Sequence, residues 1–269
     1  MSKRKFSIDI SILKEHDIIN KKSKDFKEIP IIDLENLEIF DSIDYGGCSI
    51  IFDANYKNNQ VILKKNHQKI GKHHYYSLKV IYNSECKNIL KPIGISGCRK
   101  YIIYPLIHGE TLCYEVFKKT KYNNNIIKNL IQCVYELHSL DLIHSDIKPN
   151  NFILTKDNNI TMIDVDNIIP VINEKPVTHC LYPQFGTIGF RKPLKNGKIS
   201  FEDDFWSLGA TIYNLYSNKV PYQNFINNYN TLTDEEKQNY LTKCFLTKNI
   251  DYNCLNKKLN KKILEKLFY

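Results

Sequence analysis

Four residues that lie close together in the sequence have the types and spacing that phosphoryl transfer requires. Asp146 and Lys148 stand two positions apart, followed by Asn151 and, thirteen residues later, by Asp164. A carboxylate such as Asp146 accepts the proton of an attacking hydroxyl, and a lysine such as Lys148 neutralises charge on the phosphate in transit. Asn151 and Asp164 offer amide and carboxylate oxygens, which are the ligands that magnesium takes. Together these side chains supply most of the protein groups that phosphoryl transfer needs.

The segments after Asn151 predict a hairpin that brings these oxygens together. Residues 152–155 and 160–163 are short apolar runs on either side of a polar turn, residues 156–159. Such a hairpin places Asn151 and Asp164 at the same edge of one loop. Ahead of the loop, apolar residues recur at helical spacing and predict a core helix that leads into His144: Ile127, Leu130, Ile131, Val134, Leu137 and His138.

Composition and length are those of a globular protein that can bury a sizeable core. The chain has 269 residues, of which 42% are hydrophobic and 25% charged. Its formal charge of +9 comes almost wholly from lysine, because Arg4, Arg99 and Arg191 are the only arginines. Nucleic-acid binders usually rely on arginine for bidentate contacts, so we interpret the charge as a solvated surface, with acidic partners as the alternative. No stretch approaches the length of a membrane span.

The cysteines and the first residues indicate an intracellular protein. Eight cysteines are scattered without a C-x-x-C or metal-ligand spacing, which predicts buried, reduced thiols. The basic start has no apolar core of a signal peptide. Lys3-Arg4-Lys5 is interpreted as part of a solvated tail, with a nuclear signal as the alternative. We therefore expect a cytoplasmic location, with the nucleus as the alternative.

The octet His144–Asn151 has the pattern H-x-D-x-K-x-x-N and resembles the catalytic loop of the protein kinases. Asp164-Val165-Asp166 stands where that family has D-F-G. Further stretches follow in the family's order. Val61–Lys64 resembles the V-A-I-K strand, Gly186–Leu194 resembles G-T-x-x-Y-x-A-P-E, and Asp203–Gly209 resembles D-x-W-S-L-G. The recurrence of these motifs in one order makes the resemblance specific.

The resemblance implies an α+β, bilobal protein kinase-like fold with a β-rich N-lobe and a helical C-lobe. Residues 1–36 would form a basic N-terminal extension and residues 37–269 the kinase-like domain. Within that domain the N-lobe would cover about 37–104, the hinge about 105–109 and the C-lobe about 110–269. The compact size and loose motifs are also similar to small kinases encoded by large insect DNA viruses.

The resemblance also implies a role for each site residue, with ATP and Mg²⁺ as the cofactors. Asp146 and Lys148 would be catalytic, Asn151 and Asp164 would hold the metal, and Asp204 would brace the catalytic loop. The nucleotide would be bound by a glycine turn, a strand lysine and the hinge: Gly46, Gly47, Ile51, Lys64, Tyr104 and Leu106. Tyr104 would stand behind the adenine, and Leu106 would offer it backbone groups.

Several positions in the small lobe depart from the family pattern. Asp44 and Ser49 replace the outer glycines of the nucleotide loop. Residues 65–84 contain no Asp or Glu, so the helix predicted at 73–83 has no glutamate for Lys64. By its register with 88–90, which we interpret as the start of the fourth strand, Ser77 takes the glutamate's place, and Glu85 comes after the helix.

Departures in the second half concern regulation. Serine replaces arginine at Ser145, so the usual partner of a phosphorylated activation segment is missing. Between Asp164 and Thr187, the candidate acceptors Thr178 and Tyr182 have no obvious cationic partner. Leu194 replaces a glutamate, and no arginine follows Arg191 to pair with it.

Three functions compete at this point. Lys148 and Thr187 favour a serine/threonine protein kinase that acts on a protein hydroxyl. The eroded nucleotide loop and the missing helix acid favour a pseudokinase that serves as a binding module. A small-molecule phosphotransferase is disfavoured by Lys148, by Gly186-Thr187 and by Asp204-x-Trp206. We expect ATP and a protein substrate as partners, and neither a membrane nor a nucleic acid. The sequence does not define an oligomeric state.

Overall fold

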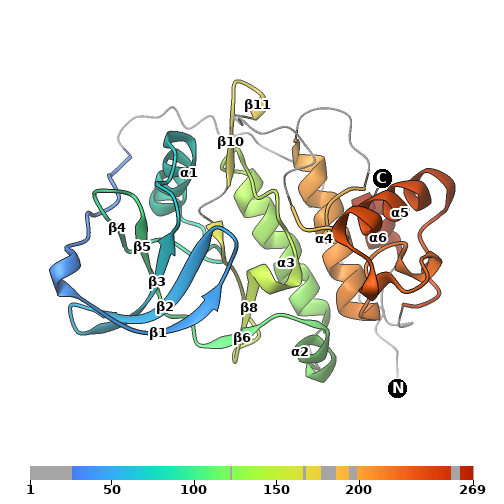
Figure 1. Cartoon of the computed structure of the whole chain (residues 1–269), viewed down its shortest axis with the longest axis horizontal. Helices are drawn as coiled ribbons and strands as arrows, with labels where there is room; N and C mark the ends of the chain where they lie inside the picture. Colours follow the sequence, from blue (N-terminus) through green and yellow to red (C-terminus); the bar gives the residue numbers. More distant parts are fainter. Residues whose placement is uncertain are drawn as a thin grey trace, which may run out of the picture.

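The structure is a computed structural model that describes residues 26–121, 123–165, 168–176, 186–193, 199–255 and 261–268. A sheet-rich lobe with one long helix lies beside a lobe built mainly of helices (Figure 1). The predicted α+β, two-lobed fold is therefore confirmed.

The N-lobe sheet is antiparallel, with strand order β1-β2-β3-β5-β4. A tight turn explains the hairpin of β2 and β3: Lys57 and Asn58 both have positive φ, as a two-residue hairpin loop requires. The predicted fourth strand at 88–90 is wrong. There the amide of Leu90 donates to the carbonyl of Met162 at 2.9 Å, so this segment docks on the C-lobe hairpin instead. The strands are β1 (Leu37–Tyr45), β2 (Ser49–Tyr56), β3 (Asn59–Asn66), β4 (Gly94–Ile95) and β5 (Tyr101–Pro105).

Helix α1 (Lys72–Asn83) confirms the helix predicted at 73–83. Leu78 and Ile81 are fully buried, because the apolar residues of the helix recur on the face that meets the sheet. The helix ends at Asn83, with Ser84 as its C-cap, so Glu85 lies beyond it and is exposed.

The C-lobe is organised around α4 (Phe201–Ser217), which is buried along most of its length. Its first turn is closed by Asp203, whose carboxylate accepts hydrogen bonds from the Ser200 amide at 2.7 Å and hydroxyl at 3.1 Å. The apolar stripe predicted before His144 lies on α3 and packs into the same core. The other helices are α2 (Tyr114–Lys119), α3 (Asn123–His138), α5 (Asp234–Thr247) and α6 (Lys261–Phe268).

Short strands between the lobes carry the catalytic loop. Strands β8 and β9 form the predicted hairpin around residues 156–159. Strand β7 comes directly before the catalytic loop and pairs with β10, which follows Asp164 in the chain. The short strands are β6 (Gly109–Thr111), β7 (Leu142–Ile143), β8 (Phe152–Thr155), β9 (Ile160–Met162), β10 (Ile169–Ile172) and β11 (Lys175–Pro176).

The seven cysteines in the described ranges are all unpaired, as the scattered spacing predicts. Cys133 and Cys244 are buried, whereas Cys48 and Cys98 are exposed, so the prediction of burial holds for only some of them. Cys180 lies outside the described residues. Across those same ranges, every helix is too short or too polar to cross a bilayer.

Candidate functional site

The catalytic loop brings three side chains into one hydrogen-bonded triangle. Asp146 accepts from Lys148 Nζ at 2.8 Å on Oδ2 and from the Thr187 hydroxyl at 2.7 Å on Oδ1. Lys148 Nζ also donates to the Thr187 hydroxyl oxygen at 2.9 Å. Asp146 and Lys148 remain about one-quarter exposed, so an incoming hydroxyl and phosphate can reach them. The triangle joins a proton acceptor to a cation at one accessible point.

Asn151 lies at the base of this loop, with only 5% of its surface exposed. Its side-chain Nδ2 donates to the carbonyl of Asp146 at 2.8 Å, which turns the amide oxygen the other way. Its own carbonyl accepts from the amide of Ile163 at 2.8 Å, directly before Asp164. The hairpin therefore brings Asn151 and Asp164 together, as the sequence predicts.

Asp164 adopts a left-handed backbone conformation, with φ of 60°, and forms an ion pair with Lys64. Burial of the carboxyl opposes its ionisation, but the Lys64 ammonium outweighs burial, so the pKa of Asp164 lies below its usual range. Asp164 is thus an ionised carboxylate one residue after Ile163, whose amide bonds to Asn151. The donor pair of Asp164 and Asn151 fits a hard cation such as Mg²⁺.

Asp204 of α4 holds the backbone of the catalytic loop. Its carboxylate is fully buried and accepts from the amides of His144 and Ser145, each at 2.8 Å. Ser145 has φ of 69°, a conformation that costs of order 1–3 kcal/mol in a residue other than glycine. The two charge-assisted hydrogen bonds offset that strain.

His138 is a hydrogen-bond partner of Asp204 that the sequence did not predict. It belongs to the apolar stripe of α3, yet its Nε2 lies 2.9 Å from Asp204 Oδ2. Its ring packs against Phe201 and Phe205. A histidine within an apolar stripe was the available signal, but its partner lies 66 positions away in the sequence.

Lys64 reaches the site from β3, with 6% of its surface exposed. The buried face of α1 presents Ser77 toward the segment that follows Asp164, and the Ser77 hydroxyl donates to the carbonyl of Ile168 at 2.9 Å. Lys64 thus forms its ion pair with Asp164. Helix α1 is joined to the site through the hydrogen bond from Ser77 to Ile168, in which neither group is charged.

We predict that Lys64→Met lowers phosphoryl transfer roughly 10- to 100-fold, the worth of a charge-assisted contact. The change removes the cation beside Asp164 and beside the expected phosphates. Glu85→Gln should change the rate less than about twofold, because Glu85 is exposed beyond the end of α1. Steady-state rates with ATP measure both effects. Equal losses in the two variants would mean that Lys64 and Glu85 form an ion pair.

The glycine turn joins β1 and β2 above the site. The amide of Gly46 donates to the carbonyl of Ser49 at 2.8 Å, and both Gly46 and Gly47 are exposed. Ile51 follows on β2 and pairs with Lys64 across the sheet. Asp44 is exposed, and its carboxylate accepts from the amide of Tyr45 at 2.8 Å.

The hinge follows β5. Tyr104 is 3% exposed and belongs to the main hydrophobic core, and Leu106 is half-buried just beyond the strand. The six residues expected to bind nucleotide thus lie on β2, β3, the turn between β1 and β2, and the end of β5 with the hinge.

Side chains of α5 hold the end of the activation segment, at Arg191 and Pro193. The side chain of Gln238 on α5 donates to the carbonyl of Pro193 at 2.6 Å and accepts from Arg191 Nη2 at 2.9 Å. Thr242 donates to the same Pro193 carbonyl at 3.1 Å. Protein kinases join this segment to the C-lobe with a glutamate–arginine pair, and this sequence has neither partner. The contacts from Gln238 and Thr242 join the segment to α5 instead. Leu194 is outside the described residues.

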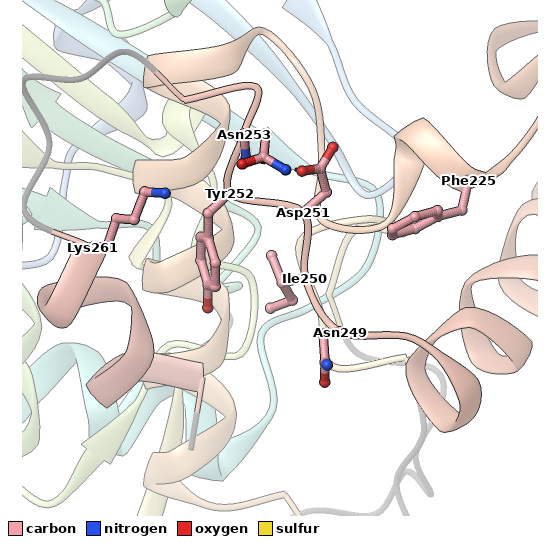
Figure 2. Close-up of a pocket in the computed structure, with 7 residues that line it drawn as sticks. All are labelled: Phe225, Asn249, Ile250, Asp251, Tyr252, Asn253 and Lys261. Atoms are coloured by element: carbon pink, nitrogen blue, oxygen red, sulfur yellow. Dashed lines mark hydrogen bonds between the residues drawn. The ribbon is translucent and has the colours of Figure 1, made fainter.

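A cavity of about 560 Å³ lies in the C-lobe, and the residues that line it do not include the catalytic loop (Figure 2). It is lined by the loop 249–253 together with Phe225 and Lys261. Its one carboxylate, Asp251, already accepts from the Asn253 amide and from the Asn224 side chain, both at 2.9 Å. We therefore place the chemistry at the Asp146 loop and not in this cavity.

The chain belongs to the protein kinase family, because the family model for the protein kinase domain matches residues 45–267. It is 27% identical over 206 residues to Aurora kinase A-B of Xenopus laevis. The aligned region covers 71% of this chain and 49% of that protein. The chain is 25% identical over 233 residues to the serine/threonine-protein kinase MPS1 of Encephalitozoon cuniculi, with 81% and 39% covered. The chain thus spans half or less of the length of these relatives.

Proposed function

We propose that the protein is a serine/threonine protein kinase that transfers the γ-phosphate of ATP to a protein hydroxyl. The observation that carries the proposal is the triangle of Asp146, Lys148 and Thr187. A carboxylate held between a lysine and a threonine hydroxyl can accept a proton while the lysine meets the phosphate. The named relatives are serine/threonine or Aurora kinases, which agrees with this substrate class.

In the proposed reaction the substrate hydroxyl oxygen bonds to the γ-phosphorus as the bond from that phosphorus to the bridging oxygen breaks. ADP leaves, and Asp146 receives the hydroxyl proton. Lys148 neutralises charge on the phosphoryl group, and Lys64 holds the other phosphates. Asn151 and Asp164 would hold Mg²⁺, which when bound neutralises charge on the phosphate chain.

The nucleotide would lie between the glycine turn and the hinge. Gly46 and Gly47 leave the backbone accessible above the phosphates, and Ile51 covers the ribose side. Tyr104 limits the depth of the adenine pocket, and Leu106 offers it backbone groups.

A pseudokinase remains the second candidate, favoured by one observation. Lys64 pairs with Asp164, so the same lysine that would hold phosphate also neutralises the proposed metal ligand. In that case the chain would bind a protein partner, with weak or no phosphoryl transfer.

Incubation with labelled ATP, Mg²⁺ and basic or acidic test proteins separates these functions. A kinase should give phosphoserine or phosphothreonine in at least one test protein, and the label should disappear with Asp146→Asn. ATP binding without any transferred label would support the pseudokinase.

We expect activity without phosphorylation of the activation segment. Ser145 carries no charge with which to hold a phosphate, and Thr187 already contacts Asp146 and Lys148 in the unmodified chain. Phosphatase-treated protein and the Thr178→Ala/Tyr182→Phe variant, whose sites lie outside the described residues, should both retain most of the parent rate. A tenfold loss in both, about 1.4 kcal/mol of barrier, would show that phosphate orders the segment.

A further inference from the structure

The segment Phe26–Asp33, which we call the strap, lies along the outside of the N-lobe before β1 (Figure 1). Ile29 is 1% exposed and packs in the core that contains Leu78 and Ile81 of α1. Ile32 is 5% exposed and packs in a second cluster, with residues of β2, β3 and β5. The strap is therefore part of the folded lobe.

Backbone contacts dock the strap on the edge strand β4. The amide of Ile95 donates to the carbonyl of Pro30 at 2.9 Å, and the amide of Ile32 donates to the carbonyl of Ile95 at 3.0 Å. A side chain at Gly94 would lie 2.5 Å from Ile32 and 2.9 Å from the Pro30 carbonyl. The glycine thus allows the strap to approach this closely.

Two strap residues hold one face of α1. The side chain of Asn83 accepts from the Lys27 amide at 2.8 Å and donates to the Lys27 carbonyl at 2.9 Å. Glu28 accepts from the Tyr75 hydroxyl at 2.8 Å and forms an ion pair with Lys79. Tyr75, Lys79 and Asn83 are four residues apart, so they share one face of the helix.

The other face of α1 leads to the site. Ser77 is fully buried and donates to the carbonyl of Ile168, four residues after Asp164. The position of α1 therefore sets the path of the chain that carries Asp164. Because Lys64 has no acid on α1, the usual ion pair does not fix the helix here.

We propose that the strap is a built-in clamp that holds α1 where the nucleotide site needs it, in place of an ion pair from Lys64. This inference rests on the proposed phosphoryl transfer from ATP. Glu28, Asn83 and Ser77 are positioning residues, because they act through α1 and the backbone at Ile168 and touch neither nucleotide nor substrate.

The double variant Glu28→Ala/Asn83→Ala tests the clamp, because it removes the polar contacts and leaves Ile29 and Ile32 in place. The exposed Glu28–Lys79 pair alone is worth at most about fivefold in an equilibrium, and the two backbone contacts of Asn83 add to it. We expect the Kd for ATP with Mg²⁺ to rise about tenfold, which equals about 1.4 kcal/mol. Amide hydrogen exchange should accelerate in α1 and β10 and stay unchanged in α4.

Glu38→Ala is the matched control, since Glu38 is an exposed glutamate on β1 outside the strap, and it should leave both measurements unchanged. The swapped variant Glu28→Lys/Lys79→Glu should bind ATP within about threefold of the parent, because the ion pair is rebuilt with its charges reversed. An unchanged Kd and unchanged exchange in the double variant would overturn the proposal. So would exchange that accelerates equally in α4, since that indicates general destabilisation.

The readouts also separate this inference from the proposed function. ATP binding and hydrogen exchange are measured without phosphoryl transfer. A parent protein that binds ATP but transfers no phosphate would therefore contradict the proposed kinase activity and leave the clamp testable. If the parent binds no ATP, the proposed function fails, and exchange in α1 still decides whether the strap clamps the helix.

Discussion

The Asp146→Asn variant should bind ATP as tightly as the parent and transfer phosphate roughly 10²- to 10⁴-fold more slowly. The amide cannot accept the proton of a substrate hydroxyl. It also places an N–H group where Asp146 now accepts from either Lys148 or the Thr187 hydroxyl, so one of these donors loses its acceptor. The loss should therefore appear in kcat and leave the nucleotide contacts of the other lobe unchanged.

Single-turnover transfer and equilibrium ATP binding, measured on the same preparation, check this prediction. Asp164→Asn is the comparison, because removal of the proposed metal ligand should weaken ATP binding that depends on Mg²⁺. If Asp146→Asn phosphorylated a protein as fast as the parent, the assignment of Asp146 as the proton acceptor would be wrong.

The Asp204→Ala variant should lose at least about 2 kcal/mol of folding stability, since each of two buried donors left without an acceptor costs about 1–3 kcal/mol and a third, partly buried donor adds to the loss. The donors are the amides of His144 and Ser145 and the ring of His138. Without the hydrogen bonds to Asp204, the strain of the left-handed conformation at Ser145 is no longer offset, and we expect the Asp146 loop to relax. Asp204→Asn should cost less, because its amide oxygen still accepts.

Urea unfolding of the parent, Asp204→Ala and Asp204→Asn measures these differences in the free energy of unfolding. The dependence of that free energy on urea concentration should be the same in all three. Asp157→Ala is a matched control, since Asp157 is an exposed aspartate in the turn between β8 and β9, and its effect should stay within about 0.5 kcal/mol. A loss below about 1 kcal/mol for Asp204→Ala would show that water replaces the carboxylate and that the loop is held by other contacts.

Local features of the fold were predictable from the sequence. The hairpin around residues 156–159 follows from two apolar runs and a polar turn, and α1 and α3 follow from helical spacing. The proximity of Asn151 to Asp164 in the chain fold could also be predicted, because the hairpin bonds the Asn151 carbonyl to the amide of Ile163, the residue before Asp164. The stretch 88–90 has the composition of a strand, but its backbone bonds to Met162, a partner 72 positions away from Leu90, so local propensity gave the wrong element.

Contacts across long separations were beyond such reasoning. Ser77 donates to a backbone carbonyl 91 positions away, and a carbonyl carries no sequence signal. Glu28 and Lys79 are 51 positions apart within a chain rich in lysine, so their pairing cannot be distinguished from many others. The same holds for His138 and Asp204. The proximity of the candidate site residues could therefore be predicted, whereas most of the contacts that hold them in place could not.

The docking of the strap on β4 also has a consequence for association between molecules. A sheet edge with free N–H and C=O groups can pair with a strand of another chain, which leads to aggregation. The strap occupies the Ile95 amide and carbonyl on that edge, and its own side chains Ile29 and Ile32 cover apolar surface of the lobe. A shortened protein that starts after residue 33 would expose both the open β4 edge and the apolar surface beneath the strap, so we expect it to aggregate more readily than the parent.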